Sequence, residues 1–411
     1  MSLLSVDFRV PSIVGGSRDF SFQRARGRRY QTIYQRWYAQ LSEQKRNVEF
    51  RYRENVLWIA GEVIPAIGMA FARLAQHVQT LVDNIFLFLR ILRNPGAALV
   101  VPATQMTAPS LEISDDFAPF FPENGQDSPY VCLGSLDGRG IWFPFGWELH
   151  PVELEVDGRK IHGMKVGKAK HLNNGKWVLY SSGNGQFFEH TLLYSDDFYA
   201  QMDHFEYNVL LFHYPGVGKS EGPCTKERMV KSYSALLSFL ENEMSAKEII
   251  GWGFSIGGGV QGEALKEHQL KETVRYCFVK DRTFSDLSSA ARDLVRPSLI
   301  GVIAAQLVRA FAWDFSSVES SRELKAPEVI IQTGEWRDAA LMKESGDLSE
   351  TDEIITKNAS LAHKLFSDFH SSHNKKFIVV PEWHCGSLSS DSVRLVLYTA
   401  QQLMSDSGNF F

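Results

Sequence analysis

The chain has 411 residues, 44% of them apolar, which is enough for two domains or for one large domain with a substantial extension. Its formal net charge of −5 disfavours general nucleic-acid binding. The charge is uneven, because residues 1–54 hold 11 Lys and Arg against 5 Asp and Glu. The four cysteines form no Cys-x-x-Cys pair, so we expect reduced thiols, with neither a zinc site nor a disulfide framework.

Residues 1–54 are predicted to form a basic arm in which aromatic side chains lie among the arginines, four of which fall between Arg24 and Arg29. Such an arm either is solvated and leads into an amphipathic helix, or binds an anionic surface. No basic stretch followed by an apolar core begins the sequence, so a secretory signal peptide is not expected. We therefore expect a cytoplasmic or peripherally membrane-associated protein, with non-classical secretion left open.

Residues 55–94 are the most apolar part of the chain and are predicted to form a hydrophobic helical hairpin. The stretch 56–72 contains one charge, Glu62, and is interrupted by Pro65. It is at the short end of the roughly 20 apolar residues that a membrane span needs, and a central glutamate is costly in hydrocarbon. We favour a hairpin that packs on the main domain or lies on a membrane surface. The proline-containing segment 95–128 is predicted to be a linker or an irregular wrapping segment.

From about residue 129 the pattern changes to short β-type runs that alternate with helix-length segments. Residues 152–156 and 160–166 predict an antiparallel hairpin around the turn pair Asp157-Gly158. Six later runs are apolar enough to be buried on both faces of a sheet: 177–180, 208–212, 248–252, 276–279, 329–331 and 377–380. The region 129–411 therefore predicts an α/β domain with a mostly parallel sheet, an antiparallel N-terminal hairpin and helices on both faces.

A Gly-x-Ser-x-Gly pentapeptide centred on Ser255 follows one of these runs and precedes a helix-competent stretch. This is the pattern of a nucleophile elbow, a sharp strand-to-helix turn that lifts a serine hydroxyl clear of the sheet. Gly253 and Gly257 are needed because a side chain at either position would collide with the neighbouring strand or helix. The pentapeptide alone also occurs by chance in glycine-rich loops, so the assignment depends on catalytic partners elsewhere in the chain.

The order of these elements resembles the α/β-hydrolase superfamily over about residues 140–405. A second motif supports the resemblance, because residues 208–222 end in the Gly-x-Gly-x-Ser-x-Gly pattern of many members. Its matching residues are Gly216, Gly218, Ser220 and Gly222. The chain departs from the usual motif at His213 and Pro215, where most members carry Asp and Arg. This departure lies in a supporting loop and removes no catalytic group.

The resemblance implies a Ser, acid and His triad that occurs in this order along the chain. His384 lies just after the last predicted strand, 377–380, and is the best candidate for the base. The acid should follow the preceding strand, where Asp338 and Glu335 compete. We favour Asp338, because its register relative to the apolar residues that follow fits the family pattern and because aspartate is the commoner partner of the imidazole.

Two backbone N–H groups are also required to bind the oxyanion that develops during acyl transfer. The amide of Ile256, directly after the nucleophile, is predicted to be the first. The second is expected from the Ser-Gly-Asn-Gly loop after residues 177–180, which resembles the family's His-Gly-Asn-Gly loop with Ser182 in place of His. Either Asn184 or Gly185 then supplies the amide.

The segment from Asp281 resembles the Arg-Thr/Pro-Phe-Ser-Ser-Leu segment of peptidase-like and thioesterase-like members. This likeness makes Phe284 and Ser285 candidates for the substrate pocket. The apolar residues that follow, with Phe311 and Trp313, predict a small lid at about 286–320.

The leading hypothesis is therefore a serine hydrolase that cleaves an ester, thioester or amide of a small-molecule or acyl substrate, with no cofactor and no metal. The alternative is a catalytically weak or inactive scaffold that binds a membrane or a host protein through residues 1–94. The combination of a hydrophobic N-terminal region with this hydrolase-like region resembles a chlamydial family of proteins without an established role, which implies a bacterial protein.

Overall fold

The structure is a computed structural model, and the residues that it describes are 111–119, 130–136, 139–144, 146–194, 196–294, 298–334, 352, 354–369 and 372–407. The predicted basic arm and hydrophobic hairpin, residues 1–94, lie outside these ranges, so their proposed contact with a membrane or a host protein stays a prediction. Within the described ranges, no helix combines the length and apolar composition needed to cross a membrane.

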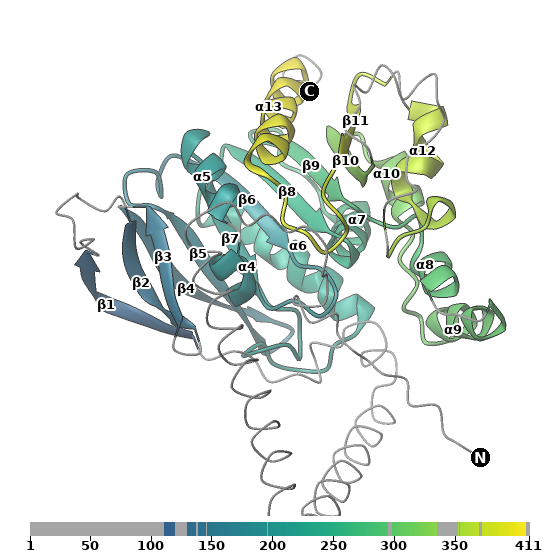
Figure 1. Cartoon of the computed structure of the whole chain (residues 1–411), viewed down its shortest axis with the longest axis horizontal. Coiled ribbons are helices and arrows are strands. Elements are labelled where there is room, and N and C mark those ends of the chain that lie inside the picture. Colours follow the sequence, from purple (N-terminus) through teal and green to yellow (C-terminus); the bar gives the residue numbers. More distant parts are fainter. Residues whose placement is uncertain are drawn as a thin grey trace, which may run out of the picture. The chain divides into compact units, whose positions relative to one another are not determined.

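The main sheet contains eight strands among the described residues (Figure 1). They are β4 Trp147–Val156, β5 Arg159–Lys168, β6 Lys176–Ser181, β7 Asn208–Phe212, β8 Glu248–Phe254, β9 Arg275–Asp281, β10 Glu328–Thr333 and β11 Lys375–Val380. Their order across the sheet is β11-β10-β9-β8-β6-β7-β5-β4. The hairpin β4-β5 is antiparallel and β5 pairs antiparallel with β7, whereas β6 to β11 run parallel. This is the strand order of the α/β-hydrolase fold, and it confirms the predicted fold class.

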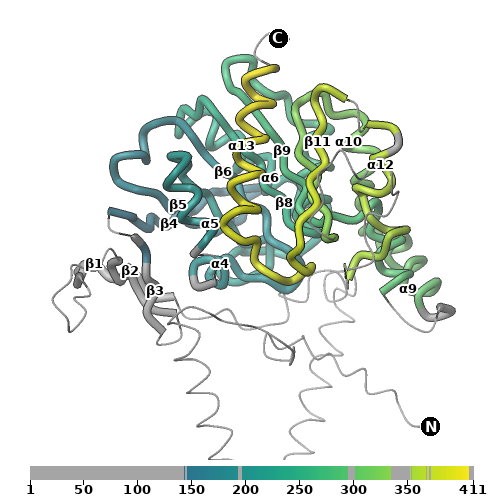
Figure 2. Tube along the Cα trace, turned by 45° about the horizontal axis from the view of Figure 1, so that its top comes forward, coloured from purple at the N-terminus to yellow at the C-terminus, as the bar shows by residue number. Residues whose placement is uncertain are grey.

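Helices cover both faces of the sheet. They are α4 Phe188–Tyr194, α5 Asp196–His204, α6 Lys226–Asn242, α7 Ile256–Glu267, α8 Leu287–Leu294, α9 Ser298–Ala310, α10 Ser317–Glu323, α12 Leu361–Phe369 and α13 Ser390–Ser407, with a short 3₁₀ helix η2 at Lys357–Ala359. Buried side chains of α6 and α7 form one hydrophobic cluster with the sheet, and those of α5 and α13 form a second. Figure 2 shows α13 running across the sheet.

Strand β7 shows why the apolar runs fold as buried strands. Leu210 and Phe212 belong to the cluster beneath α6 and α7, whereas Val209 and Leu211 belong to the cluster beneath α5 and α13. Side chains of a strand alternate between the two faces, so a sheet covered on both sides needs an apolar residue at every position. This is the reason that the continuous run at 208–212 predicts a central strand.

A separate antiparallel sheet is formed by β1 Leu111–Pro119, β2 Tyr130–Leu136 and β3 Arg139–Pro144. Strand β1 falls inside the segment 95–128, which was predicted to be a linker or an irregular wrapping segment, and so residues 111–119 of that segment form a strand. The pairing of β1 with β2 is interrupted by a register shift between Ile113 and Ala118. Only the first residues of β1, Leu-Glu-Ile-Ser, alternate apolar and polar side chains, which is too short a pattern to predict a strand on its own.

The register between β10 and β11 is fixed in part by a buried ion pair at their start. Glu328 lies opposite Lys375, and Lys375 Nζ donates a hydrogen bond to Glu328 Oε2 at 2.6 Å. Both side chains are buried, and the second carboxylate oxygen accepts a hydrogen bond from Ser321 Oγ at 3.0 Å. This ion pair forms only while the two strands keep this register.

We expect Lys375→Met to lower the free energy of unfolding by about 3–5 kcal/mol, because it leaves a buried carboxylate without its partner. The double variant Lys375→Met/Glu328→Leu removes both charges, so it should lower the free energy of unfolding clearly less than the single variant does. Urea denaturation followed by circular dichroism measures both. Equal losses in the single and the double variant would contradict the coupling.

Candidate active site

Ser255 lies in the sharp turn between β8 and α7, as predicted for a nucleophile elbow. Its backbone angles are φ 52° and ψ −115°, a conformation that residues other than glycine rarely adopt. The Ser255 N–H donates a hydrogen bond to the carbonyl oxygen of Asp281 at 2.8 Å. This bond ties the strained turn to the end of the neighbouring strand β9.

The glycines on either side of Ser255 allow the turn to pack closely. A Cβ atom at Gly253 would lie 2.6 Å from the Cα atom of Gly258. One at Gly257 would lie 2.1 Å from the carbonyl oxygen of Ser181, at the end of β6. Both distances are too short for a side chain, so each position of the motif is restricted to glycine for a steric reason.

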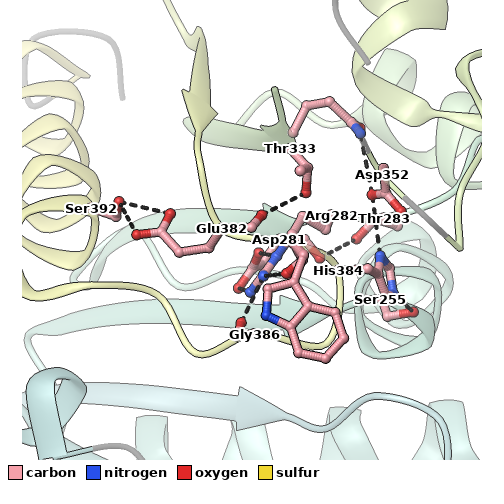
Figure 3. A network of polar contacts seen from close by, with 12 residues as sticks. Ser255, Asp281, Arg282, Thr283, Thr333, Asp352, Glu382, His384, Gly386 and Ser392 are labelled. Atoms are coloured by element: carbon pink, nitrogen blue, oxygen red, sulfur yellow. Dashed lines mark hydrogen bonds and ion pairs between the residues drawn. The ribbon is translucent and has the colours of Figure 1, made fainter. Parts of the chain in front are cut away.

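His384 is in the loop that follows β11, and its imidazole points toward the elbow (Figure 3). The Nε2 atom lies 3.1 Å from Ser255 Oγ, which is hydrogen-bonding distance. The ring is buried, as is most of the serine. The structure therefore brings together the two residues that were predicted to be nucleophile and base, from positions 129 residues apart in the chain.

The carboxylate behind this imidazole belongs to Asp352, whose Oδ2 atom lies 3.2 Å from His384 Nδ1 (Figure 3). Asp338 and Glu335, the two candidates from the sequence, lie outside the described residues. The prediction of Asp338 or Glu335 as the acid is therefore untested, and Asp352 is the carboxylate that contacts His384 among the described residues. The sequence reasoning relied on the residues directly after β10 and did not consider Asp352, which lies further along the chain.

Asp352 is fixed by a set of hydrogen bonds that the sequence did not reveal. Its Oδ1 atom accepts hydrogen bonds from the backbone N–H groups of Ile354 and Ile355, at 3.0 and 2.8 Å. Its Oδ2 atom accepts one from Gln332 Nε2 at 3.3 Å, and Gln332 Oε1 in turn accepts one from Ser360 Oγ at 2.6 Å. Gln332 is a buried polar residue in a strand, a signal that could have marked it as part of the site.

The surroundings of Asp352 favour its charged form. Burial raises the pKa of this carboxyl group, but the hydrogen bond and charge of His384, with the N–H groups of Ile355 and Ile354, lower it more. The net pKa lies below the ordinary value for aspartate. The group is therefore ionised at neutral pH and able to stabilise a protonated imidazole.

The loop after β6 lies against the start of α7, where an oxyanion site was predicted. The N–H of Ile256 is at the first position of α7 and so falls outside the hydrogen-bond ladder of the helix. The close approach of Gly257 to the backbone of Ser181 places this loop beside the nucleophile. Asn184 is exposed and Gly185 has a φ of 72°, in a turn that follows Gly183. The choice between Asn184 and Gly185 as second donor stays a prediction.

Tyr214 holds the loop at the position where Ser182 replaces the family's histidine. Its hydroxyl donates a hydrogen bond to the carbonyl oxygen of Ser182 at 2.8 Å and lies 2.8 Å from Ser181 Oγ. The neighbouring departure, His213, is buried with its Nε2 atom 2.8 Å from Glu189 Oε2. At Ser182 the bonded group is the backbone carbonyl, because the side-chain hydroxyl is buried without a hydrogen-bond partner, whereas at His213 the imidazole itself is bonded through Nε2.

The residues predicted to line a substrate pocket do not share one environment. Phe284 and Trp313 belong to the buried cluster beneath α6 and α7, and Ser285 is also buried. Phe311, just beyond α9, is 44% exposed. Their role as pocket residues stays a prediction.

The predicted lid region contains α8, α9 and α10, with a groove of about 200 Å³ lined by residues of α8 and α9. Among the described residues, no group of three or more His, Cys, Asp or Glu side chains is arranged to hold a metal ion.

A family model described as "Chlamydia CHLPS protein (DUF818)" matches residues 149–404. No curated protein matches the chain.

Several solved structures are similar to part of this chain. An esterase from Pyrococcus furiosus is 20% identical over 64% of this chain and 90% of its own, with a TM-score of 0.42. An alpha-beta hydrolase from Vibrio vulnificus is 16% identical over 62% of this chain and 80% of its own, with a TM-score of 0.42. A thioesterase domain from the curacin biosynthetic pathway is 10% identical over 62% of this chain and 99% of its own, with a TM-score of 0.36.

The lowered pKa of Asp352 predicts a pH-dependent contribution to stability. A carboxyl group whose pKa is lower in the folded state stabilises the protein above its unfolded pKa of about 3.9, and this contribution disappears as the pH falls through the folded value. The difference in free energy of unfolding between the wild type and Asp352→Asn should therefore be largest near neutral pH and shrink below about pH 4. Urea titrations at several pH values test this, and a difference that does not change with pH would contradict it.

Proposed function

The chain belongs to the Chlamydia CHLPS protein (DUF818) family, and we propose that it is a serine hydrolase that cleaves an ester, thioester or amide bond through an acyl-enzyme. One observation carries the proposal: the His384 imidazole lies 3.1 Å from Ser255 Oγ on one side and 3.2 Å from Asp352 Oδ2 on the other. A serine at a strained elbow, a buried imidazole and an ionised carboxylate in this arrangement are the parts that acyl transfer requires.

In the proposed first step, Ser255 Oγ attacks the carbonyl carbon of the substrate while His384 Nε2 accepts the hydroxyl proton. Asp352 keeps the Nδ1 proton in place and stabilises the imidazolium that forms. The negative charge on the substrate oxygen is bound by the N–H of Ile256 and by a second N–H from Asn184 or Gly185.

The tetrahedral intermediate then collapses, and the bond to the leaving group breaks as His384 donates its proton to that group. Water enters, and its oxygen adds to the acyl carbon while His384 accepts one of its protons. The second tetrahedral intermediate collapses with cleavage of the bond to Ser255 Oγ, and His384 returns the proton to this oxygen, which releases the acid and restores Ser255. Ser255, His384 and Asp352 provide the same nucleophile, base and charge stabilisation for an ester, a thioester and an amide, so the proposal includes all three types of bond.

We expect the intact chain to react covalently with a fluorophosphonate probe at Ser255, because such probes phosphonylate serines that an adjacent base activates. Ser255→Ala removes the nucleophile and His384→Ala removes the base, so both variants should remain unlabelled. Intact-protein mass spectrometry measures the reaction, and circular dichroism verifies folding of each variant. A folded wild type that does not react with the probe would refute the proposed function.

A matched pair of variants tests which aspartate orients the imidazole. Asp352→Asn keeps the shape of the side chain but removes its charge, and a loss of this kind lowers kcat by about 10⁴-fold in a serine protease triad. We expect a loss of between about 10² and 10⁴-fold here, and no comparable loss for Asp338→Asn. Hydrolysis of p-nitrophenyl butyrate is the assay. The opposite ranking of the two variants would restore Asp338 as the acid.

A further inference from the structure

Arg282 is a buried arginine directly after β9, and its guanidinium contacts two separate parts of the site. Its Nε and Nη2 atoms donate hydrogen bonds to the two carboxylate oxygens of Asp281, at 2.7 and 3.3 Å. Its Nη1 atom donates to the carbonyl oxygens of Trp383 and Gly386, at 2.7 and 2.8 Å. Figure 3 shows this guanidinium beside the loop that carries His384.

The two carbonyl groups that Arg282 binds are the ends of one tight turn. Residues 383–386 form this turn, which is closed by a hydrogen bond from the Gly386 N–H to the Trp383 carbonyl oxygen at 2.9 Å. His384 is its second residue. A single nitrogen of Arg282 therefore joins both ends of the turn, and the turn is unable to rotate or open without breaking charge-assisted hydrogen bonds.

The same guanidinium is linked to the nucleophile. It lies over the ring of Phe254, with its central carbon 5.0 Å from the ring centroid. The Phe254 ring lies 5.4 Å from the imidazole of His384, and Phe254 immediately precedes Ser255. Arg282 thus contacts the residue before the nucleophile and the turn that carries the base, so it is able to fix their relative position.

Asp281 completes the connection. Its carboxylate accepts a hydrogen bond from Trp252 Nε1 at 3.1 Å, and its backbone carbonyl accepts the N–H of Ser255. Burial lowers the pKa of Arg282, but the neighbouring Asp281 raises it more, so the guanidinium stays charged. The two residues form a compensated ion pair between the elbow and the histidine turn.

The backbone of Arg282 is also unusual. Its φ is 46°, a value that a residue with a long side chain rarely adopts, and its N–H donates a hydrogen bond to the carbonyl oxygen of Ile331 at 3.0 Å. Strained backbone of this kind persists where the surrounding contacts determine it, and it is concentrated at functional sites. At Arg282 this conformation occurs in a residue whose side chain extends from the end of β9 to the turn at 383–386.

We propose that Arg282 is a positioning residue of the hydrolytic site: held by Asp281, it fixes the turn at 383–386 so that His384 Nε2 stays within hydrogen-bonding distance of Ser255 Oγ. This inference rests on the proposed function, since it assigns a role to Arg282 in the same reaction. A lysine is unable to replace the arginine, because one ammonium group lacks the planar fork that donates to the carboxylate and to both carbonyl oxygens together.

The test compares Arg282→Lys with Arg275→Lys. Arg275 is the matched control, because it lies on β9, is exposed and pairs with the carboxylate of Glu248. We expect Arg282→Lys to lower kcat for p-nitrophenyl butyrate and the rate of fluorophosphonate labelling by about 10²-fold or more, with KM within about threefold, since a displacement of about 1 Å at a reacting group costs about that much. Arg275→Lys should behave as the wild type.

A second variant covers the case in which Arg282→Lys does not fold. A Cβ atom at Gly386 would lie 2.6 Å from Trp383 Cδ1, so Gly386→Ala disturbs the turn and leaves the arginine in place. It should reproduce the loss of kcat with little change in KM. A thermal melt establishes that each variant is folded. A folded Arg282→Lys or Gly386→Ala with wild-type kcat would overturn the positioning role.

A third measurement separates this inference from the proposed function. Cys385 is exposed on the same turn, so its rate of alkylation by iodoacetamide, followed by mass spectrometry, reports the order of the turn without any need for catalysis. We expect Arg282→Lys to alter this rate and Arg275→Lys to leave it unchanged. If the wild type is not labelled at Ser255, the proposed function fails. If the wild type is labelled and Arg282→Lys matches it in both labelling and alkylation, only the positioning role fails.

Discussion

The close approach of α7 to the ends of β6 and β8 is the constraint on which the site depends. A helix of ordinary composition would stand further from the sheet, but Gly253, Gly257 and Gly258 leave no side chain in the contact. Ser255 is forced into a left-handed conformation at this point, and its N–H finds a partner in the carbonyl of Asp281. The conformational strain at one residue is therefore balanced by backbone packing and hydrogen bonding around it, and the hydroxyl is presented above the sheet.

The parallel sheet then determines which loops meet at that hydroxyl. Strands β8, β10 and β11 all end at one edge, so the elbow, the loop that carries Asp352 and the turn that carries His384 converge there. The buried pair of Glu328 and Lys375 fixes the register of β10 and β11 at their opposite ends. An interaction at the far ends of these strands therefore contributes to the distances between Ser255, His384 and Asp352.

Local patterns were sufficient to predict the sheet, the sharp turn at Ser255 and the position of His384, because each depends on residues near in sequence. Ser255 is marked by its flanking glycines, and His384 lies in the loop just after an apolar strand. The contact of Asp352 with His384 was beyond this reasoning, because Asp352 is separated from β10 by a long connection and the contact is a tertiary one. Gln332 was not predicted to belong to the site for a similar reason, because its partners Asp352 and Ser360 are distant from it in sequence. Strand β1 likewise depends on pairing with β2.

The turn at 383–386 is held by Arg282 through main-chain carbonyl oxygens. Hydrogen bonds to carbonyl oxygens do not depend on which side chains the bound segment carries. Gly386 is the exception in this turn, because the ring of Trp383 lies where its Cβ atom would be. The position of the turn is therefore defined by its main chain at residues 383 and 386, and not by the exposed side chain of Cys385 that lies between them.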